Sequence, residues 1–245
     1  MQQISQPFPL SGTKNTRELG GYRNEDGKYL KKHAFLRSDA LNLITPEDAR
    51  FLSDYGVRCV IDFRFPDERE RFPDRKELFD SSVQFAAVSL QDPVRIKRYA
   101  DEEFPPSMWE LYCWMLDDSQ PEFREVFETI ARHPQGTVLF HCTGGKDRTG
   151  MVAMLLLKLA GVDDETVIGD YALTEVFMKE MFVLQTKELE SRGLVVPQYI
   201  MQSPASNMEK ALQHLAEQYG SAADYLARIG LKQETIQVLR EKLLD

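Results

Sequence analysis

The chain has 245 residues, of which 42% are hydrophobic and 28% are charged, a balance typical of a globular protein with one large core. Its formal net charge of −9 excludes a protein that binds nucleic acid or an anionic membrane through its whole surface, although a local basic pocket is compatible with it. Three cysteines without close spacing do not suggest a disulfide framework, so a reducing compartment is expected.

The first seven residues lack the basic and apolar regions of a signal peptide, and no run of 18 apolar residues occurs in the chain. We therefore expect no integral membrane segment. The expected location is the cytoplasm, or the outside of the cell after secretion by a signal-independent route. Residues 1–245 are expected to form a single domain without a nucleic-acid partner.

Strands and helices alternate in the N-terminal part of the chain. Strands are predicted in three short runs, at positions 34–38, 57–61 and 83–88. Between the first two lies a predicted helix that begins at Thr45, whose hydroxyl can cap it, and ends at Gly56.

Charged residues follow the second predicted strand. Asp62 and Arg64 come at its carboxyl end, where open α/β sheets bind ligands. Two interpretations remain open, because these side chains either support a site or only pair with each other. The charged run 66–73 is predicted to be a solvated helix or loop.

The interval 91–118 has no sheet pattern and carries several aromatic residues. It is interpreted either as peripheral helices that complete the core or as part of a mobile lid, spanning about 91–131, that controls access to a site. Cys113 in this interval and Cys59 in a predicted strand are expected to be packing residues.

The C-terminal half is predicted to be mainly helical. Helical patterns occur at 121–131, 151–160, 163–171, 173–191 and 231–244, with two shorter helices that end at Gly220 and Gly230. In the pattern at 173–191, four apolar residues repeat at helical spacing and are expected to face the core: Val176, Phe177, Met181 and Leu184.

A buried strand at 136–140 leads through the loop 141–150 into the apolar helix 151–160. Together with the earlier strands, this order predicts an α/β fold with a central, mostly parallel sheet flanked by helices. The loop would lie between a core strand and a buried helix.

The loop has the sequence HCTGGKDRTG, in which Cys142 and Arg148 enclose five residues. A loop that opens into a helix directs unpaired backbone N–H groups and the positive end of the helix dipole at one spot, which suits an anion such as phosphate. The Arg148 guanidinium can bind two oxygens of that anion. The same positive surroundings favour a thiolate at Cys142, which would be nucleophilic at neutral pH.

Two other interpretations of the loop are weaker. A nucleotide-binding P-loop requires Ser or Thr after Gly-Lys, but Asp147 follows Lys146. A purely structural role for Cys142 as a small buried residue does not explain why two cations and an acid crowd beside it.

His-Cys-x5-Arg-Thr resembles the signature loop of the cysteine-dependent protein tyrosine phosphatase superfamily. The variant GKDRTG at 145–150 is most similar to the bacterial tyrosine/serine phosphatase branch. This resemblance implies action on phosphotyrosine, with phosphoserine, phosphothreonine and phosphoinositides as further possibilities, and phosphate as product and inhibitor. It implies neither a cofactor nor a metal.

Further segments resemble the same branch. The stretch Asn15–Tyr22 is similar to its Asn-x-Arg-x-Leu-Gly-Gly segment, which makes Arg17 a candidate near the site, and Asp62-Phe63-Arg64 is similar to an Asp-Leu-Arg element. By resemblance to phosphoinositide phosphatases, Lys146 either admits inositol lipids or pairs with an acidic neighbour.

The resemblance assigns a role to each residue of the loop. Cys142 is the expected nucleophile, and Arg148 is expected to bind the phosphoryl oxygens. The backbone from Thr143 through Gly144, Gly145 and Lys146 is expected to bind these oxygens as well. Thr149 would donate a hydrogen bond to the thiolate and help it leave, while His141 would orient the loop.

The general acid is expected inside the loop. Many relatives carry it on an upstream Trp-Pro-Asp loop, but that triplet is missing here. Asp147 is the expected acid, and Asp117 and Asp118 are the alternatives.

Two hypotheses from other classes remain. A catalytically silent phosphate-binding module would bind phosphopeptides without turnover, but the complete set of Cys142, Arg148 and Thr149 disfavours it. A thiol-redox enzyme lacks an adjacent resolving cysteine.

Overall fold

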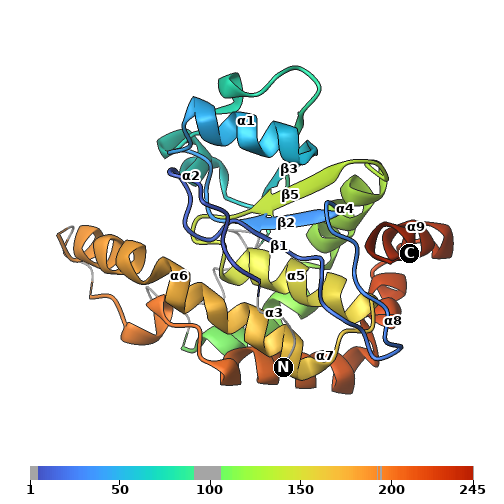
Figure 1. The fold of residues 1–245 in the computed structure, drawn as a ribbon. Coiled ribbons are helices and arrows are strands. Elements are labelled where there is room, and N and C mark those ends of the chain that lie inside the picture. Colours follow the sequence, from blue (N-terminus) through green and yellow to red (C-terminus); the bar gives the residue numbers. More distant parts are fainter. Residues whose placement is uncertain (1–4, 91–105, 192, 194, 245) are drawn as a thin grey trace.

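The computed structural model describes residues 5–90, 106–191, 193 and 195–244. Within them, a five-stranded sheet with the order β1-β2-β5-β3-β4 forms the centre of the molecule (Figure 1). Its strands are β1 (Arg17–Glu18), β2 (Phe35–Ser38), β3 (Val57–Asp62), β4 (Gln84–Ala87) and β5 (Thr137–His141). β1 pairs antiparallel with β2, and the other pairs are parallel. The expected α/β fold with a mostly parallel sheet is confirmed.

Alternate residues of the central strands face opposite sides of the sheet, as the pleat requires. One side carries Phe35, Ile61 and Phe140 and belongs to the larger core. The other carries Leu36, Val60 and Leu139 and belongs to a smaller core beneath a single helix. These central strands are buried on both faces, which explains their continuous apolar runs.

Helix α1 (Pro46–Tyr55) covers the smaller core (Figure 1). Its predicted ends are confirmed, because the Thr45 hydroxyl accepts a hydrogen bond from the Asp48 amide at 3.1 Å and Gly56 has a left-handed φ of 105°. The remaining helical segments are α2 (Pro66–Arg71), η1 (Lys76–Leu78), α3 (Met108–Asp118), α4 (Gln120–Ala131), α5 (Asp147–Leu159), α6 (Asp164–Ser191), η3 (Gln198–Met201), α7 (Ala205–Tyr219), α8 (Ala222–Arg228) and α9 (Gln233–Leu243).

Helix α5 occupies the centre of the larger core. It lies beneath the sheet in Figure 1, with α3, α6 and α7 beyond it, and it is buried along almost its whole length. This burial explains its nearly uniform apolar sequence. It also fixes the start of α5 relative to the end of β5.

Helix α6 differs from the prediction in two ways. It is continuous from Asp164 to Ser191, where two helices were predicted. The prediction of its core face was wrong, because Val176 and Leu184 are 68% and 58% exposed while Met178 and Phe182 are buried. Apolar residues occur all around this helix, so their spacing alone did not define one face.

The possible lid at 91–131 can be assessed from residue 106 onward, since 91–105 lie outside the described residues. Helix α3 buries Tyr112 and Leu116 in the larger core and packs against α7. This part of the segment completes the core. Cys59 and Cys113 are buried as expected, and burial raises the pKa of each thiol to about 11.

Among the helices of the described ranges, none combines the length and apolar character needed to cross a membrane.

Candidate active site

The loop 142–146 connects β5 to α5 at the carboxyl end of the sheet. β5 lies between β2 and β3, so the loop follows the central strand. Cys142 comes directly after that strand and is 2% exposed. Because α5 begins at Asp147, the first amides of this helix, which have no partners within it, lie beside the loop.

The carbonyl groups of the loop are bound from its outer side. The Ala40 amide donates to Thr143 O (3.1 Å), Asn15 Nδ2 to Gly144 O (3.0 Å) and Arg37 Nη2 to Gly145 O (2.8 Å). The N–H and C=O groups of a trans peptide point in opposite directions, so the amides of Gly144, Gly145 and Lys146 face the inner side. Converging amides of this kind form an anion-binding concavity.

The loop requires glycine at position 145. Gly145 has a φ of 67°, in the left-handed region that favours glycine. A Cβ atom there would also lie 2.5 Å from the backbone oxygen of Ser38 on β2. The loop is therefore packed tightly against the end of a neighbouring strand.

Arg148 is oriented by Glu68 of α2. Its Nη1 and Nη2 donate to the two carboxylate oxygens of Glu68 at 2.6 and 2.9 Å. This bidentate contact uses one edge of the guanidinium, and Arg148 Nε–H makes no hydrogen bond within the part of the chain that the structure describes. The edge that carries Nε therefore remains available for an anion.

The Arg148–Glu68 contact keeps both groups charged. Burial disfavours the Arg148 cation, but the bonds to Glu68 and the negative charge of Cys142 outweigh it and raise the Arg148 pKa. Burial likewise opposes ionisation of Glu68, yet Arg148 lowers the Glu68 pKa to about 2. The prediction that the run 66–73 is simply solvated was wrong for Glu68, which is 25% exposed.

Asp170 of α6 holds two arginines behind the loop. It accepts hydrogen bonds from Arg17 Nε at 3.2 Å and from Arg37 Nη1, and all three side chains are almost fully buried. Burial alone would raise the pKa of Asp170, but the two cations lower it. Arg37 in turn binds the carbonyl of Gly145, so Asp170 supports the loop through Arg37.

Arg17 lies near the site but does not reach the inner side of the loop. Its guanidinium donates to Asp170, Thr174 and Asn15. Asn15 binds the loop carbonyls, so Arg17 supports the site indirectly.

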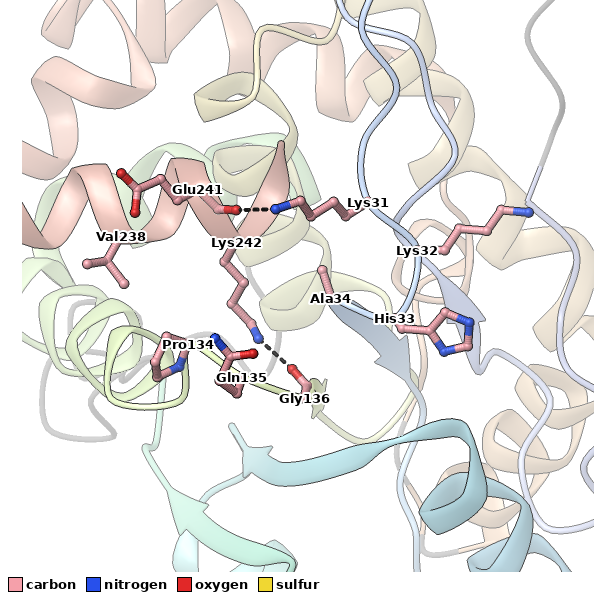
Figure 2. Close-up of a pocket in the computed structure, with 10 residues that line it drawn as sticks. All are labelled: Lys31, Lys32, His33, Ala34, Pro134, Gln135, Gly136, Val238, Glu241 and Lys242. Atoms are coloured by element: carbon pink, nitrogen blue, oxygen red, sulfur yellow. Dashed lines mark hydrogen bonds between the residues drawn. The ribbon is translucent and has the colours of Figure 1, made fainter. Parts of the chain in front are cut away.

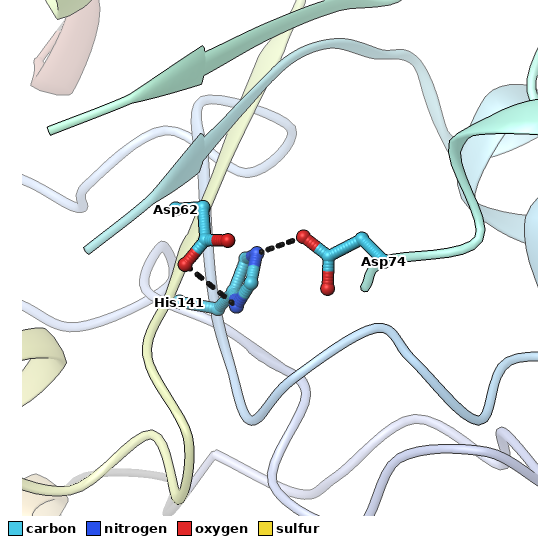
Figure 3. Close-up of side chains that lie close together, drawn as sticks. All are labelled: Asp62, Asp74 and His141. Atoms are coloured by element: carbon cyan, nitrogen blue, oxygen red, sulfur yellow. Dashed lines mark ion pairs between the residues drawn. The ribbon is translucent and has the colours of Figure 1, made fainter. Parts of the chain in front are cut away.

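Asp62, Asp74 and His141 lie close together (Figure 3), and Arg64 completes one buried cluster with them. Arg64 bridges the two carboxylates, with its Nη2 2.8 Å from both Asp62 Oδ2 and Asp74 Oδ1. His141 Nε2 lies 3.1 Å from Asp74 Oδ2, and His141 Nδ1 lies 3.1 Å from the carbonyl of Cys142. Asp62 and Arg64 therefore pair with each other, and the pair lies beside His141, the residue that precedes Cys142.

The charges of this cluster are balanced internally. Burial disfavours the imidazolium of His141, but Asp74 outweighs it and raises the His141 pKa. Asp62, Asp74 and His141 each place a ligand atom within 4.8 Å of the others, a spacing that can hold a metal ion. Arg64 binds both carboxylates and, together with a charged His141, balances their two negative charges, so the donor set does not fit an added divalent cation.

Asp147 is in contact with a buried tyrosine. Its Oδ1 accepts a hydrogen bond from Tyr112 of α3 at 2.6 Å and lies 3.5 Å from the ammonium of Lys146. Its side chain is 30% exposed. Asp117, an alternative acid, instead binds His214 at 2.8 Å and Tyr219 at 2.6 Å. The end of α3 that carries Asp117 is therefore bound to α7.

The side chain of Lys146 binds a neighbouring segment. Its ammonium donates to the carbonyls of Ile200 and, at 3.0 Å, Gln202, and its side chain is 2% exposed. The Lys146 ammonium also lies 3.5 Å from Asp147 Oδ1, which is the pairing with an acidic neighbour that was one of the two interpretations of this residue. In contrast, the buried hydroxyl of Thr149 has no hydrogen-bond partner among the described residues. It is free to donate to a thiolate.

Five residues that contact the candidate site were not predicted from the sequence: Glu68, Asp170, Asp74, Arg37 and Tyr112. Each binds a partner more than 30 residues away, except for the Asp74–Arg64 pair. The Arg37-Ser38 pair, in the strand predicted at 34–38, is also similar to the phosphatase branch, and this likeness was the available signal for Arg37. Nothing local distinguished the other four.

A separate hollow lies at the opposite end of the sheet (Figure 2). It has a volume of about 320 Å³ and is lined by the residues that precede β2 and β5 and by α9. Lys242 in its wall donates to the Gly136 carbonyl at 2.5 Å, and burial lowers the Lys242 pKa to about 8. This hollow is distinct from the loop 142–146.

The profile of the tyrosine phosphatase family matches residues 8–245. The chain is 36% identical to a tyrosine-protein phosphatase of Nostoc commune over 222 residues, which is 86% of this chain and 74% of that protein. It is 28% identical over 120 residues to the triple specificity protein phosphatase PtpB of Mycobacterium tuberculosis, which is 44% of each chain. A crystal structure of TpbA from P. aeruginosa aligns with 93% of this chain and 97% of that one, with 16% identity and a TM-score of 0.37.

The chain thus combines an α/β fold, a loop with inward-facing amides after the central strand, and extensive sequence similarity to tyrosine phosphatases. This chain belongs to the tyrosine phosphatase family, which confirms the resemblance inferred from the loop.

Proposed function

We propose that this phosphatase hydrolyses phosphate monoesters through a phosphocysteine intermediate, with phosphotyrosine in proteins as its main substrate and phosphoserine and phosphothreonine as further substrates. The main support is the outward binding of the carbonyls of Thr143, Gly144 and Gly145, which turns three amides toward one point. These amides and the Nε edge of Arg148 are complementary to the oxygens of a phosphoryl group.

In the first step, the Cys142 thiolate attacks phosphorus, so that an S–P bond forms while the P–O bond to the leaving group breaks. Asp147 donates a proton to the leaving oxygen. In the second step, Asp147 accepts a proton from water as the water oxygen attacks phosphorus and the thiolate departs. Thr149 donates a hydrogen bond to that thiolate, in keeping with its unpaired hydroxyl among the described residues.

Phosphoinositides are the second candidate substrate. PtpB of M. tuberculosis is named a triple specificity phosphatase, and GKDR at 145–148 suggested inositol lipids. The contacts of Lys146 with Ile200 and Gln202 favour phosphotyrosine instead, since they occupy the cation that would bind additional phosphate groups. A silent binding module remains disfavoured by the complete set of loop residues.

The decisive experiment is a side-by-side turnover panel with a phosphotyrosine peptide, a phosphoserine peptide and a phosphoinositide, without added metal. We expect turnover of the tyrosine substrate, abolished in Cys142→Ser and inhibited by vanadate. Rapid acid quenching during turnover should trap the intermediate, so that the peptide containing Cys142 carries one added phosphoryl group. Activity that persists in Cys142→Ser would contradict the proposal.

Asp147→Asn tests the general acid in the same panel. We expect kcat/KM for the phosphotyrosine peptide to fall by about 10²- to 10⁴-fold. Wild-type turnover with an unchanged pH profile would exclude Asp147, and Asp117 and Asp118 would then be tested in turn.

A further inference from the structure

Two buried tyrosines form a hydrogen-bonded chain that leads from the core of the protein to Asp147. The hydroxyl of Tyr112 donates to Asp147 Oδ1 at 2.6 Å and lies 2.8 Å from the hydroxyl of Tyr171 on α6. Their rings meet edge to face, with centroids 5.9 Å apart, and both side chains are at most 1% exposed. Core packing therefore fixes the hydroxyl that contacts Asp147.

The hydrogen bonds between these groups have one direction. Tyr112 has a single hydroxyl proton, and since it is donated to Asp147, the proton between the tyrosines must come from Tyr171. The Tyr171 oxygen in turn accepts from Asn207 Nδ2 at 3.4 Å. Burial and the charge of Asp147 raise the pKa of Tyr112 well above its ordinary value, so that Tyr112 remains a donor.

The two oxygens of Asp147 differ in their surroundings. Oδ1 receives the Tyr112 hydroxyl and also lies 3.5 Å from the Lys146 ammonium. Oδ2 makes no hydrogen bond to any residue in the described ranges, and the side chain is 30% exposed. One oxygen is thus bound to the protein, while the other is free to exchange a proton with substrate or water.

We infer that Tyr112, supported by Tyr171, is a positioning residue for the proton transfers of Asp147, an inference that rests on the proposed function. Tyr112 occupies Oδ1, so the transferred proton resides on Oδ2. As the S–P bond forms and the P–O bond to the leaving group breaks, this proton moves from Oδ2 to the leaving oxygen. The hydrogen bond from Tyr112 then stabilises the carboxylate that is left behind.

The dependence on leaving-group basicity distinguishes this role from a general structural one. The phenolate of p-nitrophenyl phosphate departs with little protonation, whereas that of phenyl phosphate needs a proton. Tyr112→Phe keeps the buried ring and removes the hydroxyl. We expect its kcat/KM to fall about tenfold or more with phenyl phosphate and less than about threefold with p-nitrophenyl phosphate. Inhibition by inorganic phosphate should remain unchanged.

Tyr225→Phe is the matched control, because Tyr225 is also fully buried and donates to the Leu116 carbonyl of α3 at 3.0 Å, away from the loop. It should leave the ratio of the two substrates unchanged. Tyr171→Phe should change that ratio in the same direction as Tyr112→Phe but by less. It also serves as the test if Tyr112→Phe does not fold.

An equal loss with both substrates, or no loss, in Tyr112→Phe would overturn the inference. If Asp147→Asn is sensitive to the leaving group and Tyr112→Phe is not, only the role of Tyr112 fails. If Asp147→Asn shows no such sensitivity, the assignment of the acid fails and the inference fails with it. Activity that survives in Cys142→Ser would mark failure of the proposed function itself.

Discussion

The carboxylate of Glu68 binds both terminal nitrogens of the Arg148 guanidinium, at 2.6 and 2.9 Å. This contact joins α2 to the first turn of α5 and orients the arginine before any substrate arrives. The Nε–H group makes no hydrogen bond within the described residues and remains available to an anion. A guanidinium held in this way loses little conformational entropy when it binds a phosphoryl group.

Replacing Glu68 by Gln is expected to lower kcat/KM for phosphotyrosine by about 10- to 100-fold, because charge-assisted hydrogen bonds to Arg148 are lost. Glu70→Gln, on the exposed side of the same helix, is the control and should match the wild type. Steady-state kinetics and vanadate titration measure the effect. Wild-type vanadate affinity in Glu68→Gln would show that Arg148 needs no such support.

The pH dependence of the Glu68 contribution has a defined sign. Its pKa is lowered from 4.5 to about 2 in the folded protein, so the stabilisation is complete above 4.5 and is lost as the pH falls through 2. Between pH 4.5 and 8, the titration of Glu68 should therefore leave the difference between the unfolding free energies of wild type and Glu68→Gln constant. Urea titrations across that range measure it.

The cluster around His141 predicts a loss of stability as the pH rises through the folded pKa of His141. The His141 pKa is raised above 6.5, so its stabilisation is fully present below 6.5 and is lost as the pH rises through the folded value. The pKa of Asp74 is lowered below 3.8, so its contribution is present above 3.8 and is lost on acidification. The pair should be most stabilising between these two limits.

Thermal unfolding of Asp74→Asn tests this expectation. The variant removes the carboxylate that faces His141 Nε2 and leaves Arg64 paired with Asp62 alone, so it should lose about 3–5 kcal/mol near pH 6. The difference from wild type should shrink as the pH rises above the folded His141 pKa. Asp80→Asn, at an exposed position, is the control. A difference that is independent of pH would mean that His141 is not charged in this cluster.

Much of the fold followed from local sequence patterns. The strand before Asp62, the capped helix after Thr45 and the strand–loop–helix unit around Cys142 were all predicted, because each is defined by residues close together in the chain. Helix α6, which carries apolar residues on all sides, was the exception. Its core face is set by packing against α5 and α7, which sequence spacing does not reveal.

The candidate site was predicted only where a motif covers it. Cys142, Asp147 and Arg148 lie within the motif at 141–150, but Glu68 and Asp170 come from α2 and α6. Glu68 lies in a run of mixed charges in which each carboxylate has several possible partners. Only the folded chain brings it to Arg148 and away from its neighbours.

Asp170 is predicted to be essential for the stability of the loop. Asp170→Asn leaves the buried cations of Arg17 and Arg37 uncompensated, which should cost about 3–5 kcal/mol of unfolding free energy. Because Arg37 binds the Gly145 carbonyl, kcat/KM should fall as well.

Urea unfolding and steady-state kinetics of the same preparation measure both effects of Asp170→Asn. Asp164→Asn is the control, since its side chain is 62% exposed and pairs only with Lys158 among the described residues. Its stability should change by at most about 0.5 kcal/mol. An Asp170→Asn protein with wild-type stability would refute the assigned role of the buried pair.

Gly145→Ala should abolish anion binding, whereas Gly169→Ala should not. Alanine at 145 is strained by the φ of 67°, and its Cβ would lie 2.5 Å from Ser38 O, which is backbone and cannot move aside. At Gly169, within α6, a Cβ meets no atom within 4 Å, so alanine should stabilise the helix by roughly 0.5–1 kcal/mol. Isothermal titration with vanadate and urea unfolding measure the two effects. Since the amides of Gly145 and Lys146 depend on this one backbone conformation, vanadate binding by Gly145→Ala at wild-type affinity would mean that they do not form the anion site.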